Sequence, residues 1–513
     1  MAMARRRDRE VDVIVVGAGN AALTAALAAR RAGCSVRVLE KAPQPFRGGN
    51  TRFTGGVFRF TYQGLDDLLP IVGDADDAAD VVVDPYPPEA FARDLRRVTG
   101  GRTDPVLSRV LIERSYDTVR WMADLGVRFE FSRAVTGIRI AGTNKTRLQP
   151  GAAIRARHEG VGLSQSLFDL ADAHGIAVLY ERPVTRILSD AAGRVTGVEA
   201  RAPGGIERHA AGAVIVASGG FQANPEMRAA YLGGPWGLVK TRGSRYNTGE
   251  LIRELLALGA QSYGDWAGRH ATPIDADAPD WGDLRLTDKT NRLSYPYGIL
   301  VNCDGERFVD EGADFNSYTY AAYGAAILAQ RNATAFQIFD SRAFALLEKR
   351  YETGVPVEAT TIPELVDGIA RRYEVLRIDA ARMRATIAEY NAAADRGEGF
   401  RPDALDGKRT RGLRPEKSNW AVPIETPPFR AYAVTGGITF TFGGVRISAR
   451  GEIVDGIDRP IPGLYGSGEL TGGFFFINYP LGCGLTRGAV FGRLAGENAA
   501  LYLGRRPAAR PSP

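Results

Sequence analysis

One stretch of the sequence decides the fold: residues 11–56, which read VDVIVVGAGNAALTAALAARRAGCSVRVLEKAPQPFRGGNTRFTGG. Residues 11–16 are apolar and mostly β-branched, which is typical of a strand buried in a parallel sheet. The turn GAGNAA follows at once and opens an alanine-rich helix, and a second strand is predicted over residues 35–40. The order of strand, glycine turn, helix and strand predicts a βαβ unit.

The glycines and the terminal acid of this unit match the fingerprint of a dinucleotide-binding site. Gly17 permits the tight turn, and Gly19 lets the backbone approach a pyrophosphate at the helix N-terminus. Ala22 stands where the fingerprint allows alanine instead of a third glycine. Glu40 lies about 20 positions beyond Gly17, where an acid accepts hydrogen bonds from a ribose. A glycine turn that only packs would not explain this acid, so the sequence predicts dinucleotide binding.

The composition argues against several other functions. The chain has 513 residues, 44% of them hydrophobic, enough for two or three domains with sizeable cores. The net charge of +6 is spread over 65 basic and 59 acidic residues without a dense basic block, so nucleic acid is not expected as a partner. Cys34, Cys303 and Cys483 have no paired spacing and histidines do not cluster, so we predict no metal, haem or iron–sulfur site.

Two features of the sequence bear on where in the cell the protein is expected. No run of about 18 apolar residues is free of glycine and charge, so no transmembrane segment is expected. The arginine-rich residues 5–9 precede a strand and a nucleotide turn instead of the apolar segment of a signal peptide. We therefore expect a cytoplasmic protein.

Two later segments return to the strand–glycine pattern. Residues 212–220, GAVIVASGG, and residues 463–469, GLYGSGE, each read as a buried strand that ends in small residues. Ligands of open α/β sheets bind at the carboxyl ends of such strands, although an ordinary turn is the alternative. Between residues 265 and 435 this rhythm stops. We therefore predict a nucleotide-binding domain formed by residues 1–264 and 436–513, with a second domain inserted over residues 265–435.

The last predicted helix, residues 484–503, carries a glycine stripe. Gly484, Gly488, Gly492 and Gly496 recur every four positions and share one helix face. Each glycine destabilises a helix by about 1 kcal/mol relative to alanine. The stripe therefore predicts the close approach of another backbone or of a flat ring.

Motifs along nearly the whole chain resemble the flavoprotein of the fumarate reductase and succinate dehydrogenase superfamily, which also contains ketosteroid dehydrogenases. They are VIVVGAGNAAL, LEKAP and GGNTRFTGG near the start, VIVASGGF in the middle, and GLYGSGE and GAVFGRLAGENAA near the end. The motifs GNAAL, GGNTR, YGDWAGRHATP, GERFVDEGADF and NYPLGCGLTRGAVFGR look most like FAD-dependent tricarballylate dehydrogenases. The resemblance implies an α/β fold, with a Rossmann-like, glutathione-reductase-like FAD-binding domain and an inserted α+β capping domain.

The resemblance also implies a set of FAD contacts. Gly17, Gly19 and Asn20 would face the pyrophosphate, Glu40 and Lys41 the adenosine, Val184 the adenine, Gly48, Gly49, Asn50, Thr51, Gly55 and Gly56 the flavin, Glu469 the ribityl chain and Leu485 the pyrimidine edge, with further cofactor contacts at Ala21, Ala217, Ser218, Gly219, Gly468 and Gly484. Asn50 stands where succinate dehydrogenases have a histidine bonded covalently to the flavin. Because asparagine is no such nucleophile, we predict non-covalent FAD.

The substrate side departs from the family pattern. The motif ERFVDE, residues 306–311, is intact, but no arginine follows at the place where fumarate reductases have their proton donor. Phe475 and Tyr479 replace a histidine and an arginine that grip a substrate carboxylate in the family. The family has a further carboxylate-binding histidine, and in this sequence Thr439 or Phe440 stands at its position. These replacements argue against fumarate or succinate as the substrate.

Three residues are candidates for acid–base chemistry. His270 precedes the sequence ATP in a position that resembles a family histidine, although a histidine that only structures a turn is the alternative. Tyr318 resembles the catalytic tyrosines of ketosteroid dehydrogenases, and Tyr479 with Pro480 resembles their Tyr-Pro element. Plain aromatic packing is the alternative for both tyrosines.

The function implied is an FAD-dependent dehydrogenase of a small molecule. It would oxidise a CH–CH bond next to a carbonyl or carboxylate by hydride transfer to flavin N5. Two alternatives stay open: an enoate reductase, because the fold does not set the direction, and a non-catalytic electron-relay subunit. With no second redox motif in the chain, electrons would pass to oxygen, to a quinone or to a separate acceptor protein.

Overall fold

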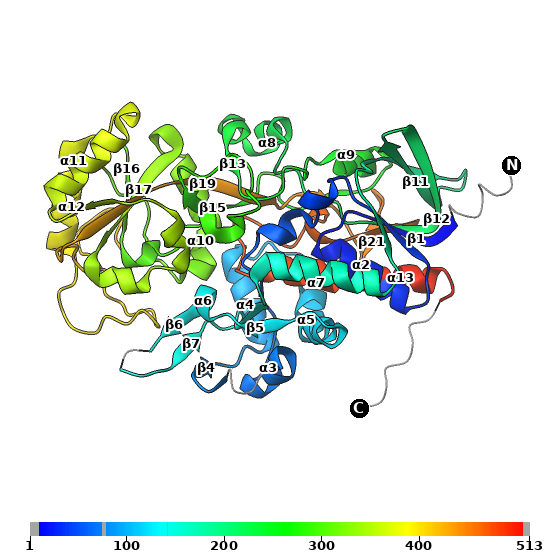
Figure 1. Cartoon of the computed structure of the whole chain (residues 1–513), viewed down its shortest axis with the longest axis horizontal. Helices are drawn as coiled ribbons and strands as arrows, with labels where there is room; N and C mark the ends of the chain where they lie inside the picture. Colours follow the sequence, from blue (N-terminus) through cyan, green and yellow to red (C-terminus); the bar gives the residue numbers. More distant parts are fainter. Residues whose placement is uncertain (1–9, 74–77, 141, 506–513) are drawn as a thin grey trace.

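Two β-sheets, one toward each end of an elongated molecule, organise the chain (Figure 1). This computed structural model describes residues 10–73, 78–140 and 142–505, so the arginines of residues 5–9 lie outside the described residues. The strands are β1 (Glu10–Val16), β2 (Val36–Leu39), β3 (Val57–Phe58), β4 (Val81–Val83), β5 (Phe129–Phe131), β6 (Gly137–Arg139), β7 (Thr146–Leu148), β8 (Ile154–Ala156), β9 (Ala177–Leu179), β10 (Val184–Ser189), β11 (Val195–Ala202), β12 (Gly205–Val216), β13 (Lys240–Thr241), β14 (Ser262–Tyr263), β15 (Arg269–Asp275), β16 (Ile299–Asn302), β17 (Thr334–Asp340), β18 (Val357–Ala359), β19 (Phe429–Thr441), β20 (Gly444–Val445), β21 (Glu452–Val454) and β22 (Pro460–Gly466). The α-helices are α2 (Asn20–Arg31), α3 (Leu65–Val72), α4 (Pro88–Val98), α5 (Pro105–Leu125), α6 (Arg133–Thr136), α7 (Glu159–Ala173), α8 (Pro225–Leu232), α9 (Glu250–Ala257), α10 (Asn316–Leu328), α11 (Ile362–Arg372), α12 (Ala380–Ala393) and α13 (Cys483–Tyr502). Short 3₁₀ turns that bear on the site are η2 (Gly49–Phe53), η5 (Thr287–Thr290), η8 (Ser341–Leu346), η9 (Lys349–Thr353) and η11 (Gly468–Leu470).

The larger sheet has a parallel core. Strand β1 lies between β2 and β12 and pairs in parallel with both, while β9 extends the sheet beyond β2. Strand β22 pairs in parallel with the last residues of β12. A small antiparallel meander adjoins this core, because β10 and β11 add antiparallel strands to the first half of β12. The predicted α/β, Rossmann-like fold is confirmed, and the glycine-rich ends of β1, β12 and β22 meet at one edge of the sheet.

Helices α2 and α13, from opposite ends of the chain, lie side by side on this sheet (Figure 1). A Cβ atom on Gly492 would overlap the carbonyl oxygen of Ala21, and one on Gly496 would overlap that of Ala25. Gly488 also faces Ala21. The glycine stripe is therefore explained by the close approach of another helix backbone. Gly484, one turn earlier, is free of this contact.

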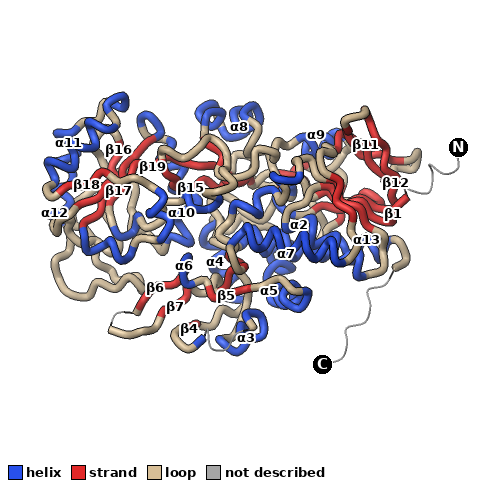
Figure 2. Tube along the Cα trace, viewed as in Figure 1, coloured by secondary structure: helices blue, strands red, loops and turns tan. Residues whose placement is uncertain are grey.

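The second sheet is built on one long strand, β19. Its first half lies between β17 and β18, and its second half between β15 and β13, with β16 beyond β17. Helices α11 and α12 cover the end of this sheet that is remote from β1 (Figure 2). The sheet draws strands from before residue 265 and beyond residue 435, and the domain division at these two positions stays a proposal.

Two helix predictions illustrate what local sequence decides. The amphipathic pattern of residues 105–126 predicts a helix, and α5 confirms it: the side chain of Asp104 caps its first turn, and Gly126 ends it with a φ of 114°. The sequence of residues 341–351 also reads as a helix, but this prediction is wrong, because two 3₁₀ turns, η8 and η9, stand there. The hydroxyl of Tyr351 in η9 donates to Gln337 of β17 over 2.5 Å and holds this segment against the sheet.

Helix α13 is also tied to the layer of helices below it. Arg493 of α13 makes an ion pair with Asp117 of α5 over 3.0 Å, and its guanidinium lies over the ring of Trp121. Among the residues described, none of the helices combines the length and the apolar character needed to cross a bilayer.

The glycine contact between α2 and α13 yields a stability prediction. Gly492→Ala should lower the urea midpoint of unfolding of the FAD-free protein, because forcing a methyl group into tight packing costs about 1–3 kcal/mol. Gly484→Ala is the matched control, since a Cβ there meets its neighbours only at 3.7 Å or more. The control should keep or raise the midpoint through better helix propensity. Equal midpoints for the two variants would contradict the assigned contact.

Candidate active site

One large cavity lies where the first, middle and last segments of the chain meet. Its volume is about 560 Å³, within the range of about 300–1,000 Å³ that is usual for ligand pockets. The cavity opens at the carboxyl edge of the larger sheet and extends to β15, α10 and β19 of the second sheet. The predicted FAD contacts that line it are Gly17, Gly19, Asn20, Ala21, Glu40, Lys41, Gly49, Asn50, Thr51, Gly55, Gly56, Val184, Ala217, Ser218, Gly219, Gly468, Glu469, Gly484 and Leu485. Gly48 instead packs against Ser164 of α7, with a φ of 99°.

The two fingerprint glycines differ in what requires them. Gly17 has a φ of 102°, and a Cβ there would lie 2.5 Å from the carbonyl oxygen of Ala217. The fold itself therefore excludes a side chain at this turn. At Gly19 a Cβ would meet no other protein atom closer than Thr51 Oγ1 at 3.4 Å. The packing does not demand glycine there, which fits close approach by a ligand.

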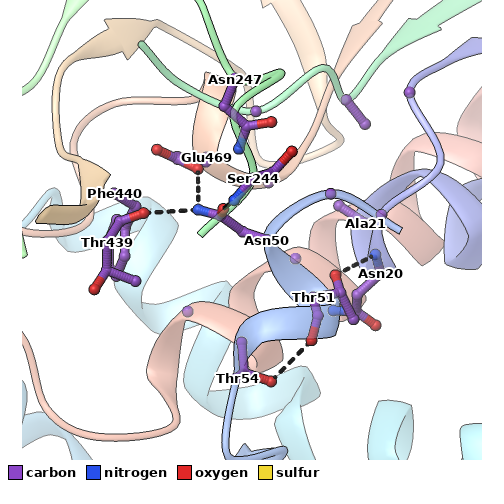
Figure 3. Close-up of a pocket in the computed structure, with 18 of the residues that line it drawn as sticks. Asn20, Ala21, Asn50, Thr51, Thr54, Ser244, Asn247, Thr439, Phe440 and Glu469 are labelled. Carbon is purple, nitrogen blue, oxygen red and sulfur yellow. Dashed lines mark hydrogen bonds between the residues drawn. The ribbon is translucent and has the colours of Figure 1, made fainter. Parts of the chain in front are cut away.

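Asn20 holds the N-termini of helices α2 and α13 together beside the cavity. Its side-chain amide donates to the carbonyl oxygen of Leu485 over 2.9 Å, and its backbone N–H donates to Thr51 Oγ1 over 2.8 Å (Figure 3). Asn20 thus joins α2, α13 and η2. Helix N-termini carry partial positive charge and bind anionic groups, so this arrangement suits a pyrophosphate and an electron-rich ring.

The acid predicted at the end of β2 is present and buried. Glu40 is 7% exposed, and one carboxylate oxygen accepts from the N–H of Ala42 over 2.7 Å. Burial raises the pKa of Glu40. Lys41 beside it pairs with Glu250 over 2.7 Å. Val184 begins β10 at the same end of the cavity, so these residues form a polar end suited to adenosine.

Asn50 is held by hydrogen bonds from both sides. Its amide nitrogen donates to the carbonyl oxygen of Thr439 over 2.7 Å and lies 3.5 Å from a carboxylate oxygen of Glu469 (Figure 3). Its amide oxygen accepts from the N–H of Ser244 over 2.9 Å. The side chain therefore links η2 to β19, and its chemistry offers no nucleophile to a flavin.

Glu469 and Arg487 are both buried at the cavity and influence each other electrostatically, which the sequence did not reveal. A carboxylate oxygen of Glu469 accepts from the N–H of Thr441 over 3.0 Å, and burial raises the pKa of Glu469 to about 7. Burial lowers the pKa of Arg487 to about 10, although the negative charge of Glu469 opposes this shift. Its guanidinium lies 5.0 Å from the ring centre of Phe475. Among the described residues, Nε of Arg487 has no hydrogen-bond partner, and Arg487 lines the cavity.

Aromatic rings close the other end of the cavity. His270 of β15 is 1% exposed and stacks on Phe440 of β19, with ring centres 5.1 Å apart. It makes edge contacts with Tyr320 at 4.7 Å and Tyr479 at 5.0 Å. Burial, together with the charge of Arg242, lowers the pKa of His270 well below its usual value. The imidazole is thus uncharged near neutral pH, and its Nδ1 lacks a hydrogen-bond partner within the described part of the chain.

The hydroxyl of Tyr479 is oriented by the start of α13. It accepts from the N–H of Gly482 over 3.1 Å. Burial raises the pKa of Tyr479, and the neighbouring Tyr320 opposes this shift. Because the Tyr479 oxygen is the acceptor in its bond with Gly482, its hydroxyl proton stays available to an oxygen atom of a bound molecule.

Tyr318 does not accompany the other two catalytic candidates. Its hydroxyl donates to Asp94 over 2.6 Å and lies 3.4 Å from Arg59, and Tyr318 does not line the cavity. On helix α10, residues two positions apart point to different faces. Tyr320, which sequence reasoning missed, is therefore the tyrosine of this helix that reaches the cavity.

Two arginines and one aspartate line the cavity near His270. Asp288 of η5 pairs with Arg242 over 2.6 Å and with Arg350 over 2.5 Å. Arg350 and Asp288 were missed because neither belongs to a recognised motif. Within the ranges that the structure describes, no group of three or more His, Cys, Asp or Glu side chains could hold a metal ion.

The buried Glu469 yields a prediction about pH. Because its pKa is raised from 4.5 to about 7, the folded state keeps a proton that the unfolded chain releases. The stabilisation from this proton is fully present below about pH 4.5 and is lost as pH rises to about 7, a loss of roughly 3 kcal/mol. Above that pH it changes no further. Glu469→Gln should remove this loss in FAD-free protein, so the variant's advantage in thermal unfolding should grow from pH 5 to pH 8. A constant difference, or the same trend in Glu89→Gln at an exposed glutamate of α4, would contradict this account.

Comparisons with known proteins agree with this geometry. A family model described as FAD binding domain matches residues 12–485. The fumarate reductase (cytochrome) of Shewanella frigidimarina is 29% identical over 498 residues, which are 96% of this chain and 77% of that protein. The open conformation of a flavocytochrome c3 fumarate reductase has a TM-score of 0.71 at 24% identity, covering 98% of this chain and 80% of its own. The 3-ketosteroid delta1-dehydrogenase of Sterolibacterium denitrificans has a TM-score of 0.70 at 19% identity, covering 96% and 100%.

The two solved structures show a likeness of fold alone. The family model spans most of the sequence, and together with the similar fumarate reductase it confirms the resemblance to the fumarate reductase superfamily. The finer likeness to tricarballylate dehydrogenases stays a prediction. FAD needs an acid for its ribose, space beside a glycine for its pyrophosphate, and positively polarised helix N-termini. The buried Glu40, Gly19 and the adjacent N-termini of α2 and α13 meet these needs. The chain therefore belongs to the FAD binding domain family of flavoproteins, and its cofactor is FAD.

Proposed function

We propose that this protein is an FAD-dependent oxidoreductase that dehydrogenates a CH–CH bond next to a carbonyl group. The observation that carries this proposal is the position of Tyr479 and His270 on the cavity that also contains the FAD-binding residues. When bound, FAD supplies the hydride acceptor. By their names, the fumarate reductase relative catalyses a reduction, and the ketosteroid dehydrogenase of similar fold catalyses a dehydrogenation.

The roles proposed for the side chains follow from their hydrogen bonds. Tyr479, whose oxygen already accepts from the N–H of Gly482, donates its proton to the carbonyl oxygen of the substrate and makes the adjacent C–H more acidic. His270, which lines the cavity, accepts the α-proton at a ring nitrogen. Because burial depresses its pKa, the imidazole holds that proton only briefly.

The reverse reaction is the second candidate. Curated relatives of this chain are reductases, including the fumarate reductase, and the same residues can deliver a proton to a reduced carbon. The electron partner is proposed to be a quinone, oxygen or a separate acceptor protein. A cytoplasmic location also stays a proposal.

Anaerobic mixing separates the two directions. We expect the yellow, oxidised protein to bleach when it is mixed with a saturated ketone that it can dehydrogenate. Chemically reduced protein that is reoxidised by an enone, without bleaching by any ketone, would instead support the reductase. A protein that responds to neither class would support the electron-relay alternative.

Tyr479→Phe should lower kcat by about 10²–10⁴-fold, the usual contribution of a general acid or base, and should keep FAD bound. His270→Ala should lower kcat by a similar factor. The matched control is Tyr318→Phe. It also removes a tyrosine hydroxyl group, but from a residue that lies outside the cavity. Equal turnover in Tyr479→Phe and Tyr318→Phe would show that the roles are misassigned.

The position of Asn50 predicts how FAD is held. Denaturation with acid should release the whole of the yellow colour into the supernatant, because no covalent bond joins the flavin to an asparagine. On a denaturing gel the protein band should show no flavin fluorescence. A fluorescent band would contradict the proposed non-covalent binding.

A further inference from the structure

We propose that Asp288 makes this cavity select uncharged carbonyl compounds over carboxylates. It does so by engaging both arginines near the proposed catalytic residues. This inference rests on the proposed function and narrows its substrate class. The alternative is that Arg242 and Arg350 form a binding site for a substrate carboxylate, as two adjacent cations in a cavity would otherwise suggest.

Both arginines are bound by the protein. Nη1 of Arg242 donates to Asp288 over 2.6 Å and to the carbonyl oxygen of Phe53 over 2.8 Å, and its Nε donates to Thr439 over 3.0 Å. Nη2 of Arg350 lies 2.5 Å from the other oxygen of Asp288. The side chains of Arg242, Asp288 and Arg350 are 7%, 4% and 10% exposed. The N–H groups that these contacts use are therefore not available to an incoming carboxylate unless it displaces Asp288.

These ion pairs lie against the backbone that is proposed to carry the flavin. A Cβ on Gly55 would lie 3.0 Å from Nη2 of Arg350 and 3.1 Å from Asp288. Arg242, Asp288 and Arg350 line the same cavity as His270. The charge of this group therefore acts on whatever molecule occupies the reacting end.

The surrounding charges are balanced. Arg350 also lies 3.2 Å from Glu348, so two guanidinium groups face two carboxyl groups. The amide of Asn291 donates over 2.8 Å to Oδ1 of Asp288. This is the same oxygen that accepts from Arg242. Arg487, a further cation on the cavity wall, has Glu469 as its counter-charge.

A neutral carbonyl has no such obstacle. Tyr479 offers one proton to its oxygen, and the rings of His270, Phe440 and Tyr320 offer flat apolar contact. A carboxylate entering this low-dielectric site would instead lose its hydration, and arginines that already pair with Asp288 would compensate that loss poorly. The site therefore favours flat, uncharged carbonyl compounds.

The test uses trans-cinnamamide and trans-cinnamate, two probes of nearly the same shape that differ in charge. Their dissociation constants are measured at pH 8 from changes in the absorption of oxidised, FAD-loaded protein. The wild type should bind cinnamamide at least about tenfold more tightly than cinnamate. Asp288→Asn, which frees the arginines, should shift this ratio toward cinnamate by at least about tenfold. The matched control is Asp275→Asn, at an aspartate that pairs with the buried Arg292 over 2.6 Å but lies outside the cavity, and it should keep the wild-type ratio.

Wild-type protein that binds cinnamate as tightly as cinnamamide, or that does not bind cinnamamide, would overturn the inference. An unchanged ratio in Asp288→Asn would overturn it as well. If Asp288→Asn fails to fold, the wild-type ratio of the two dissociation constants decides the question alone. Because the probes are measured on oxidised enzyme without turnover, this result is independent of the bleaching test for the proposed reaction.

Discussion

The contact between α2 and α13 is the constraint on which the site depends. Gly492 and Gly496 let these helices approach until side chains would overlap the partner backbone, and the amide of Asn20 then joins their N-terminal ends through Leu485. The two helices come from opposite ends of the chain, so their contact closes the nucleotide-binding domain across everything between them. Their aligned N-termini place two partial positive charges on one cavity, where a phosphate and a flavin need them.

The cofactor end of this site could be predicted from sequence, because its requirements are local. A glycine with a left-handed φ at Gly17, an acid after the second strand at Glu40 and an uncapped helix N-terminus are each visible in a few consecutive residues. Motif matching reaches its limit at Gly48, which serves the packing of α7 instead of the cavity. Asn20 lines the cavity, and the structure adds what the motif does not show, namely that its side chain also holds α13.

The reacting end could be predicted only in part. His270 and Tyr479 were found by resemblance, but choosing between Tyr318 and Tyr320 requires the rotation of α10 about its axis, which short motifs do not fix. The pairing of Asp288 with Arg242 and Arg350 brings together three separate loops and strands. The raised pKa of Glu469 comes from burial by neighbours distant in sequence. Contacts of this kind depend on tertiary packing, and no local pattern records them.

The central claim is that both ends of the chain bind one FAD, whose ring lies beneath the aromatic group of β15, α10 and β19. A crystal structure of the FAD-loaded protein tests it most directly. The account predicts density running from Glu40, across the N-termini of α2 and α13, to a flavin ring beside Asn50, with His270 and Tyr479 facing that ring. FAD bound to only one of the two helices, or a ring separated from Tyr479 by filled protein, would contradict it.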